Sequence, residues 1–300
     1  MTAPEAAGSS LPSGSRWEFE AIGTRWQVDT DVELSASVRS EVGAEIEAFD
    51  RAWSRFRPDA EIAALATAGG SIPVPVDAAP MLELYLALSA ATAEAVNPLI
   101  GDALTRRGYD AHYGLVDRGA QPAPAGWSQL LTWNDDRLTL RTPATIDIGA
   151  LGKGRLVDRV LGLVATRVNG AVTVDAGGDI ALLGSETIAL EHPFDPTRAI
   201  GVWQVTDGAL CASAIQRRAW PAADGGGLHH VLDARTGEPV RTIAATWAVA
   251  ADAMTADAAA TALFFEGGPA FAHAHAAAWV RMTTDGRVEW SSDSKAELFL

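Results

Sequence analysis

A long amphipathic helix is the element that most constrains how this chain can fold. Between about residues 33 and 57, apolar residues recur at spacings of four and three, which places them on one face of a helix. These apolar residues are Val38, Val42, Ile46, Phe49, Trp53 and Phe56. The sequence Arg-Pro-Asp at residues 57–59 ends the helix, because the residue before a proline disfavours helical backbone.

The remaining periodicity predicts a mixture of further helices and short strands. Helices are expected over residues 80–96, 154–168 and 252–265, and strands over 16–30 (two halves around Gly23), 127–133, 137–141, 171–174, 180–183, 279–282 and 287–290. The pair Gly267-Gly268 is expected to close the last of these helices. Helices and strands do not alternate regularly, and no repeat of about 20–50 residues occurs, so the sequence predicts an α+β fold.

The N-terminal segment differs in composition from the rest of the chain. Residues 1–15 are rich in Ser, Gly, Pro and Ala, which predicts disorder, whereas residues 16–300 are expected to form one domain. The segment has no basic start, no long apolar core and no cysteine, so it lacks the features of a secretion signal or a lipid anchor. No apolar run is long enough for a transmembrane helix. These observations predict a cytoplasmic protein without a membrane anchor.

The overall charge limits the partners that the protein can bind. The 300 residues include 23 basic and 38 acidic side chains, which gives a formal net charge of −15 at pH 7. This charge repels phosphate backbones and anionic lipid heads, so we expect neither nucleic acid nor a membrane surface as a partner. An anionic small substrate would need local help from a metal ion or from backbone N–H groups. The single cysteine, Cys211, cannot form an internal disulfide, which fits a reducing compartment.

Residues 145–154, with the sequence TIDIGALGKG, form the first candidate site. Small residues at a strand-to-helix transition let the backbone approach a ligand, and the N–H groups at a helix start favour phosphate. Lys153 adds a positive charge beside them. A glycine-rich turn with a solvated lysine is the alternative. The spacing matches neither of the common nucleotide-binding motifs.

Residues 252–261, with the sequence DAMTADAAAT, form the second candidate site. Asp257 and Thr261 lie four residues apart, so in a helix they stack on one face. A carboxylate and a hydroxyl are hard oxygen ligands of the kind that Mg²⁺ prefers. A buried alanine-rich helix with Asp252 as its N-cap is the alternative.

Two further motifs contain a histidine pair and a glycine pair. His229 and His230 precede an apolar stretch that leads into a turn at Gly237, so a histidine here could serve as a general base. A surface strand that enters a turn is the alternative. The sequence VDAGGD at residues 174–179 contains two glycines between strands, which suggests a close approach of the backbone.

Taken together, these motifs resemble the ApbE family, the FAD:protein FMN transferases. The matching segments are Ile146–Arg159, Val174–Ile180, His229–Val240 and Asp252–Phe264, with weaker similarity at Ala21–Thr24, Arg55–Leu65 and Ala95–Gly101. The resemblance implies a single compact α+β domain around a flavin-binding cleft. It also implies Mg²⁺-dependent transfer of FMN from FAD to a Thr or Ser hydroxyl of an acceptor protein, with release of AMP.

The resemblance assigns expected roles to individual residues. Asp257 and Thr261 match side-chain ligands of Mg²⁺, and Ala150 matches a ligand that uses its backbone carbonyl. His230 matches the proposed base. The positions that match contacts with FAD are Ile22, Phe56, Ala95, Val96, Asn97, Asp147, Lys153 and Val231. An FAD pyrophosphatase that yields FMN and AMP, and a flavin-binding protein without turnover, are the alternative functions.

Overall fold

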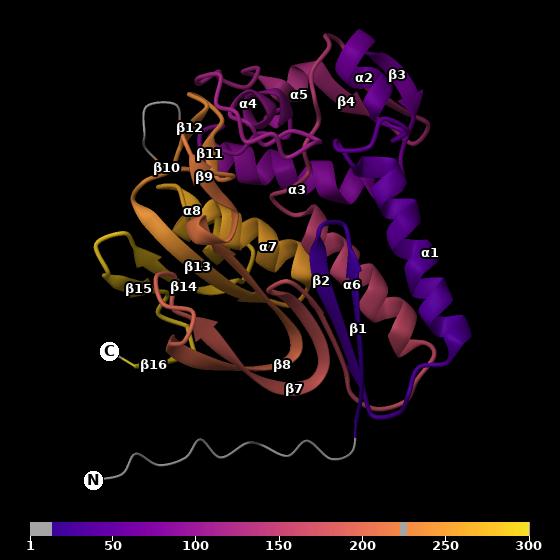
Figure 1. Ribbon diagram of the computed structural model, residues 1–300, viewed down its shortest axis with the longest axis vertical. Coiled ribbons are helices and arrows are strands. Elements are labelled where there is room, and N and C mark those ends of the chain that lie inside the picture. Colours follow the sequence, from indigo (N-terminus) through magenta and orange to yellow (C-terminus); the bar gives the residue numbers. More distant parts are fainter. Residues whose placement is uncertain (1–13, 223–226, 300) are drawn as a thin grey trace.

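A nine-stranded antiparallel sheet is the largest element of the fold (Figure 1). The protein is described by a computed structural model over residues 14–222 and 227–299. The strands, in their order across the sheet, are β1 (Ser15–Ala21), β2 (Thr24–Thr30), β6 (Val172–Ala176), β7 (Asp179–Glu191), β8 (Ala199–Ala214), β13 (Ile243–Ala250), β14 (Ala278–Thr283) and β15 (Val288–Trp290). The ninth strand, β16 (Glu297–Leu298), also pairs with β8.

Helices pack against the sheet and against one another, and smaller elements complete the fold. The helix α6 contacts both α7 and α1, and α7 also contacts β8 and β13. The helices are α1 (Ala36–Trp53), α2 (Ala63–Ala68), α3 (Ala78–Ala91), α4 (Gly101–Arg106), α5 (Trp127–Leu130), α6 (Gly152–Ala165), α7 (Ala253–Ala262), α8 (Gly268–Ala274) and the 3₁₀ helix η1 (Ile215–Arg218). The small sheets are β3 (Gly70–Pro73) with β5 (Arg137–Leu140) and β4 (Leu131–Trp133), β9 (Ala219–Pro221) with β10 (Gly227–His229), and β11 (Leu232–Asp233) with β12 (Glu238–Pro239). Antiparallel strands and irregularly placed helices confirm the predicted α+β fold.

The predicted helices end earlier than expected, and two of these ends lead into the same region. Helix α1 buries the apolar face that its spacing predicts, but it ends at Trp53, so that Phe56 lies beyond the helix. Helix α3 ends at Ala91 because Ala93 and Glu94 adopt φ angles of +51° and +62°. The residues that follow, Ala95, Val96 and Asn97, are buried.

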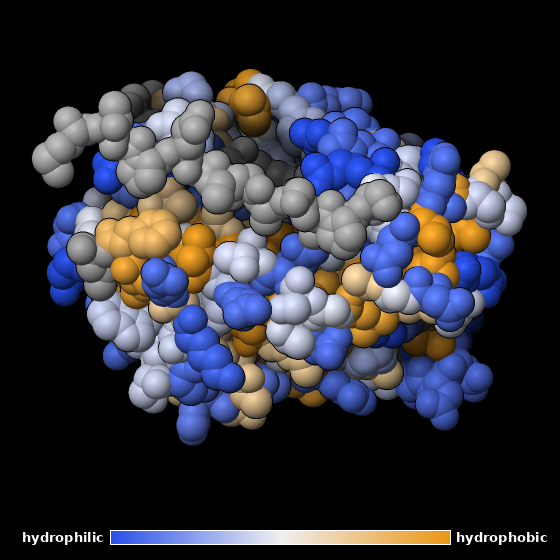
Figure 2. Space-filling model, turned by 90° about the horizontal axis from the view of Figure 1, so that it is seen from below, coloured by the Kyte–Doolittle hydropathy of each residue, from blue (hydrophilic) through white to orange (hydrophobic). Residues whose placement is uncertain are grey.

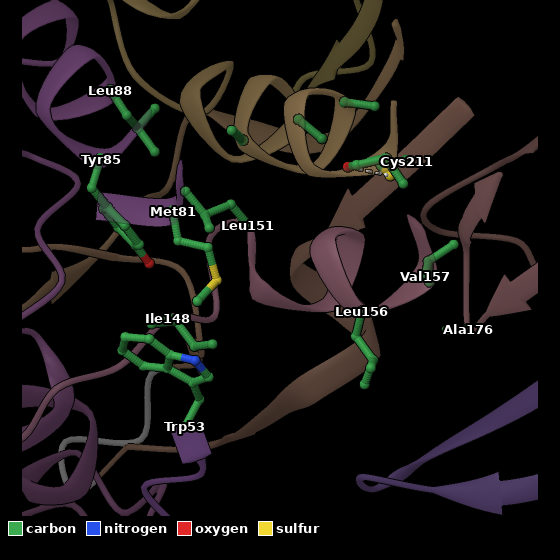
Figure 3. Packing of buried hydrophobic residues seen from close by; sticks show 14 of the residues in the cluster. Trp53, Met81, Tyr85, Leu88, Ile148, Leu151, Leu156, Val157, Ala176 and Cys211 are labelled. Carbon is green, nitrogen blue, oxygen red and sulfur yellow. Dashed lines mark hydrogen bonds between the residues drawn. The ribbon is translucent and has the colours of Figure 1, made fainter. Parts of the chain in front are cut away.

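Apolar side chains pack on both faces of the sheet. The larger cluster lies between the sheet and the helices, where Tyr85 and Met81 of α3 point toward Ile148 and Leu151 (Figure 3). Trp247 and Ala248 are neighbours in β13, yet Trp247 belongs to the smaller cluster on the other face and Ala248 to the larger one. This division follows from the alternation of side chains along a strand. On the surface seen in Figure 2, apolar side chains form small groups among hydrophilic ones.

Two predictions of secondary structure are wrong, and one predicted strand is longer than expected. Residues 127–130 form helix α5 instead of a strand, because Trp127 is buried and its Nε1 donates to Ser89 Oγ at 2.9 Å. The predicted helix over 252–265 ends at Ala262, and Gly268 begins α8 instead of closing that helix. The strand over 180–183 extends to Glu191 as β7.

Other expectations concern the N-terminal segment and the location of the protein. Residues 1–13 of the segment predicted to be disordered lie outside the described residues, and Ser15 belongs to β1. No helix in the described part of the chain has both the length and the apolar character needed to cross a membrane. The domain boundary at residue 16 and the cytoplasmic location stay predictions.

The contact between α6 and α7 requires a glycine, which gives a first prediction. A Cβ at Gly154 would lie 2.2 Å from the Ala253 carbonyl oxygen and 2.8 Å from Asp257 Cβ, whereas a Cβ at Gly162 would meet nothing within 4 Å. Gly154→Ala should therefore lower the free energy of unfolding by about 1–3 kcal/mol, because the two helices must move apart. Gly162→Ala, in the same helix, should raise it by up to about 1 kcal/mol. Urea denaturation of both variants measures the difference, and equal stabilities would contradict the close contact.

Candidate functional site

A cleft of about 460 Å³ brings together residues from distant parts of the sequence. Its walls come from the β1–β2 turn, the segments that follow α1 and α3, the loop before α6, the segment after β10, and α7. Eleven of the twelve predicted site residues line it: Ile22, Phe56, Ala95, Val96, Asn97, Asp147, Ala150, Lys153, His230, Val231 and Thr261. The twelfth, Asp257, lies behind the wall. Their individual roles stay predictions.

Asp257 lies behind the cleft, at the contact between α6 and α7. Its side chain is buried, and its Oδ2 accepts a hydrogen bond from the Gly154 N–H at 3.0 Å. Gly154 lies in the first turn of α6, where backbone N–H groups have no acceptor within the helix, so the Asp257 carboxylate satisfies one of these donors. Thr261, one turn beyond Asp257, lines the cleft.

The chemistry of these donors fits Mg²⁺. Asp257 offers a carboxylate, Thr261 a hydroxyl and Ala150 a backbone carbonyl, and all three are hard oxygen ligands. Within the described residues, no three His, Cys, Asp or Glu side chains form a group that could hold a metal ion. A site with one carboxylate relies on further oxygens from water or from substrate phosphates, which is the usual way in which proteins bind Mg²⁺.

A salt bridge between the partly exposed Lys153 and the buried Asp179 lies next to Asp257, and the sequence analysis included Asp179 only as part of the VDAGGD motif. The Lys153 ammonium lies 2.8 Å from Asp179 Oδ2 and donates to the Ala176 carbonyl at 2.9 Å. Burial alone would lower the pKa of Lys153, but the carboxylates of Asp179 and Asp257 raise it. Burial, together with the neighbouring Asp179, raises the pKa of Asp257. Lys153 is therefore not the solvated lysine of the alternative interpretation.

Asp147 is fixed by a residue that the sequence analysis missed, Arg55. The Arg55 Nε donates to Asp147 Oδ2 at 2.5 Å, and the Gly149 N–H donates to Asp147 Oδ1 at 2.7 Å. The Arg55 side chain is 3% exposed, and its guanidinium lies 4.1 Å from the centre of the Phe56 ring. The carboxylate of Asp147 is therefore held in one orientation at the cleft. Arg55 is the first residue of the segment Arg55–Leu65, which shows one of the weaker similarities to the ApbE family.

Tyr85 is a second residue that the sequence analysis missed. Its hydroxyl donates to the Asp147 carbonyl at 3.2 Å and accepts from the Ala150 N–H at 3.3 Å. Burial, and then the charge of Asp147, raise the pKa of the Tyr85 phenol well above its usual value. The phenol therefore stays protonated and remains able to donate. Nothing in the local sequence around Tyr85 distinguishes it from other core residues of a helix.

The two adjacent histidines have different surroundings. His230 lines the cleft, whereas His229 is buried and lies outside the lining. His229 Nε2 lies 2.7 Å from the Val240 carbonyl oxygen, and its Nδ1 accepts from the Val231 N–H at 3.3 Å. These partners assign the proton to Nε2. Burial lowers the pKa of His229. His229 is therefore a neutral structural residue, and His230 is the histidine that lines the cleft.

Comparisons with known proteins identify the family. Residues 22–280 match the ApbE family. The chain belongs to the ApbE family. This result confirms the resemblance that the sequence motifs carry.

Members of the ApbE family resemble the chain in both sequence and structure. A FAD:protein FMN transferase from Treponema pallidum is 29% identical over 250 residues, which cover 71% of this chain and 67% of the relative. A protein of the same name from Rhodobacter capsulatus is 26% identical over 93% of this chain and 57% of the relative. The crystal structure of the ApbE protein from Thermotoga maritima matches with a TM-score of 0.80 at 21% identity, over 93% of this chain and 97% of that chain. At this identity, the structural match shows the fold alone.

The start of α7, the helix that carries Asp257 and Thr261, gives a second prediction. Asp252 is the N-cap, as the alternative interpretation of this motif expected, and Asp158 of α6 accepts from the N–H groups of Ala253 at 2.7 Å and Met254 at 2.9 Å. Burial raises the pKa of Asp158 to about 6, although the two N–H groups oppose this shift. Between pH 4 and pH 6 the folded protein therefore binds more protons at this site than the unfolded chain does. This group makes the wild type lose stability as pH rises through that window.

Asp158→Asn should remove this contribution, since asparagine does not titrate. The free energy of unfolding of the variant minus that of the wild type should increase by roughly 2–3 kcal/mol between pH 4 and pH 7. Urea denaturation at several pH values measures the two curves. Parallel curves would show that Asp158 titrates normally.

Proposed function

We propose that this chain transfers the FMN part of FAD to a Thr or Ser hydroxyl of an acceptor protein, with Mg²⁺ bound, and releases AMP. The observation that carries the proposal is the convergence of eleven predicted site residues on one cleft, in a chain of the ApbE family. The FAD:protein FMN transferases of Treponema pallidum and Rhodobacter capsulatus support the same activity.

The cleft has the composition that a flavin dinucleotide requires. Ile22, Phe56 and Val231 provide apolar wall, which suits the ring systems of FAD. Asn97 and Asp147 provide polar groups among them, and Arg55 holds the Asp147 carboxylate in place. A few fixed polar groups in an apolar cleft orient a ligand and give specificity.

The charges around the cleft support a role for a metal ion. FAD carries two negative charges on its pyrophosphate. The basic side chains of the lining already face carboxylates: Arg55 faces Asp147, Arg57 faces Asp59 at 2.9 Å, and Lys153 faces Asp179. Mg²⁺ held by Asp257, Thr261 and the Ala150 carbonyl would offset the pyrophosphate charge and the charge that develops on the departing AMP.

The remaining step is a proton transfer, for which His230 is placed in the cleft. The acceptor oxygen forms a bond to the phosphorus of the FMN phosphate, and the bond from that phosphorus to the bridging oxygen breaks. The bridging oxygen leaves with its electron pair as part of AMP. The acceptor hydroxyl loses its proton in this exchange, and His230 accepts it. An imidazole with a pKa near 6.5 is suited to this role at neutral pH.

Incubation with FAD, Mg²⁺ and an acceptor protein separates the three candidate functions. A transferase yields flavin that stays bound to the acceptor after denaturation, with one AMP released for each flavin attached. A pyrophosphatase yields free FMN and AMP without covalent flavin. A flavin-binding protein quenches FAD fluorescence and yields neither product. We expect the first result, and free FMN in the presence of a competent acceptor would overturn the proposal.

Two variants of α7 test the metal site. Asp257→Ala should lower Mg²⁺-dependent transfer by roughly 100-fold or more, because the pyrophosphate charge is then left uncompensated. Thr261→Ala should mainly raise the Mg²⁺ concentration needed for half-maximal rate, by about tenfold. Asp252→Asn is the matched control, since it lies on the same helix and retains a capping oxygen. Wild-type transfer by Asp257→Ala would refute the metal site.

The adjacent histidines provide their own control for the base. His230→Ala should lower the single-turnover rate by about 10²–10⁴-fold while the Kd for FAD stays unchanged. His229→Gln should lower stability and leave the chemical step largely intact, because His229 bonds the Val240 carbonyl away from the cleft. The wild-type rate should rise with pH as the base loses its proton, and His230→Ala should remove that dependence. Equal losses of rate in both variants would exclude His230 as the base.

A further inference from the structure

One phenol oxygen holds both ends of the loop that precedes α6. The Tyr85 hydroxyl donates to the carbonyl of Asp147 and accepts from the N–H of Ala150, at 3.2 Å and 3.3 Å. Asp147 is an expected contact of FAD, and Ala150 is an expected ligand of Mg²⁺. Figure 3 shows the Tyr85 side chain reaching from α3 toward Ile148, which lies between these two residues.

The direction of the Ala150 carbonyl follows from the bonds on either side of it. The Ala150 N–H, bound to Tyr85, fixes the peptide plane before this residue. The Leu151 N–H donates to the Ile148 carbonyl at 3.2 Å and fixes the plane after it. The Ala150 carbonyl lies in that second plane, opposite the Leu151 N–H, because peptide units are planar and trans. Two hydrogen bonds therefore define where this oxygen points.

The Tyr85 ring is itself held in place from the side of α3. Its side chain is 1% exposed, and Trp127 packs edge-on against it, with ring centres 6.4 Å apart. Other N–H groups of this loop have acceptors within the loop. The Gly149 N–H donates to Asp147 Oδ1, and the Gly152 N–H donates to the Ile148 carbonyl. Removal of the Tyr85 hydroxyl would thus release the Ala150 N–H while the rest of the loop stays bonded.

We propose that Tyr85 is a positioning residue that holds the Ala150 carbonyl toward the metal site. This proposal rests on the proposed function, because it requires that FAD and Mg²⁺ bind in the cleft. Tyr85 itself contacts the loop and contributes no ligand atom. Its hydroxyl sets the geometry of a ligand in the way that outer hydrogen-bond partners do at other metal sites.

Binding of FAD to Tyr85→Phe, measured by flavin fluorescence, tests the role without turnover. The variant keeps the ring and removes only the hydroxyl. With Mg²⁺ omitted, its Kd for FAD should stay within about twofold of wild type, since Arg55 still holds the Asp147 carboxylate. The Mg²⁺ concentration that gives half of the Mg²⁺-dependent change in FAD binding should rise about tenfold.

Two control variants separate this role from a general loss of stability. Thr283→Val removes another buried hydroxyl, which accepts from the Arg287 N–H at 3.0 Å at the end of β14, and should leave the Mg²⁺ requirement unchanged. Arg55→Lys disturbs the Asp147 side chain and should weaken FAD binding to a similar degree with and without Mg²⁺. Only Tyr85→Phe should raise the Mg²⁺ requirement and leave the Kd for FAD without Mg²⁺ unchanged.

The outcomes distinguish failure of this proposal from failure of the proposed function. A Tyr85→Phe protein with wild-type Mg²⁺ requirement would overturn the positioning role. A wild-type protein that binds no FAD would overturn the proposed function instead. If Tyr85→Phe does not fold, Trp127→Phe replaces it in the test, because this variant keeps the Tyr85 hydroxyl and loosens the packing of the Tyr85 ring. The Mg²⁺ requirement of Trp127→Phe should rise by less than tenfold. An unchanged Mg²⁺ requirement would overturn the proposal.

Discussion

The hydrogen bond from the Gly154 N–H to the Asp257 carboxylate is the interaction on which the rest of the site depends. It joins the first turn of α6 to α7 at a distance that only glycine permits, since a Cβ at residue 154 would lie 2.2 Å from the Ala253 carbonyl oxygen. The same bond keeps Asp257 at the N-terminus of α6, where the helix dipole favours negative charge. One contact thus fixes the side chain of Asp257, an expected metal ligand, against the first turn of α6.

The acidic character of the protein shapes the cleft as strongly as its packing does. A chain with a net charge of −15 has to bind a dianionic pyrophosphate, yet the basic side chains of the cleft already face carboxylates. Arg55 and Lys153 are therefore better suited to orient Asp147 and Asp179 than to attract the ligand from solution. In the proposed function, a divalent cation would add positive charge at one point of the cleft.

The sequence predicted those parts of the site whose pattern is local. The spacing of four places Asp257 and Thr261 one turn apart on α7, while their expected role as metal ligands came from the family resemblance. The apolar face of α1 follows from its period. Arg55, Tyr85 and Asp179 have no such pattern, because each acts through a partner in a distant segment; Arg55 and Asp147, for example, are 92 residues apart. The strand β13 was missed for a related reason. It is buried on both faces, so its sequence IAATWAVA lacks the polar alternation that marks a strand at a surface.

The histidine pair shows how a buried residue can place its neighbour at the wall of the cleft. His229 bonds the Val240 carbonyl through Nε2 and the Val231 N–H through Nδ1, while the Val240 N–H donates back to the Val231 carbonyl. These bonds close the base of the small β11–β12 hairpin and leave the His229 ring no further nitrogen for a ligand. Because His229 is held on the buried side, the backbone of the next two residues is fixed at the cleft wall. His230 and Val231 line the cleft there, so the neutral, buried histidine determines where its neighbour lies in the cleft.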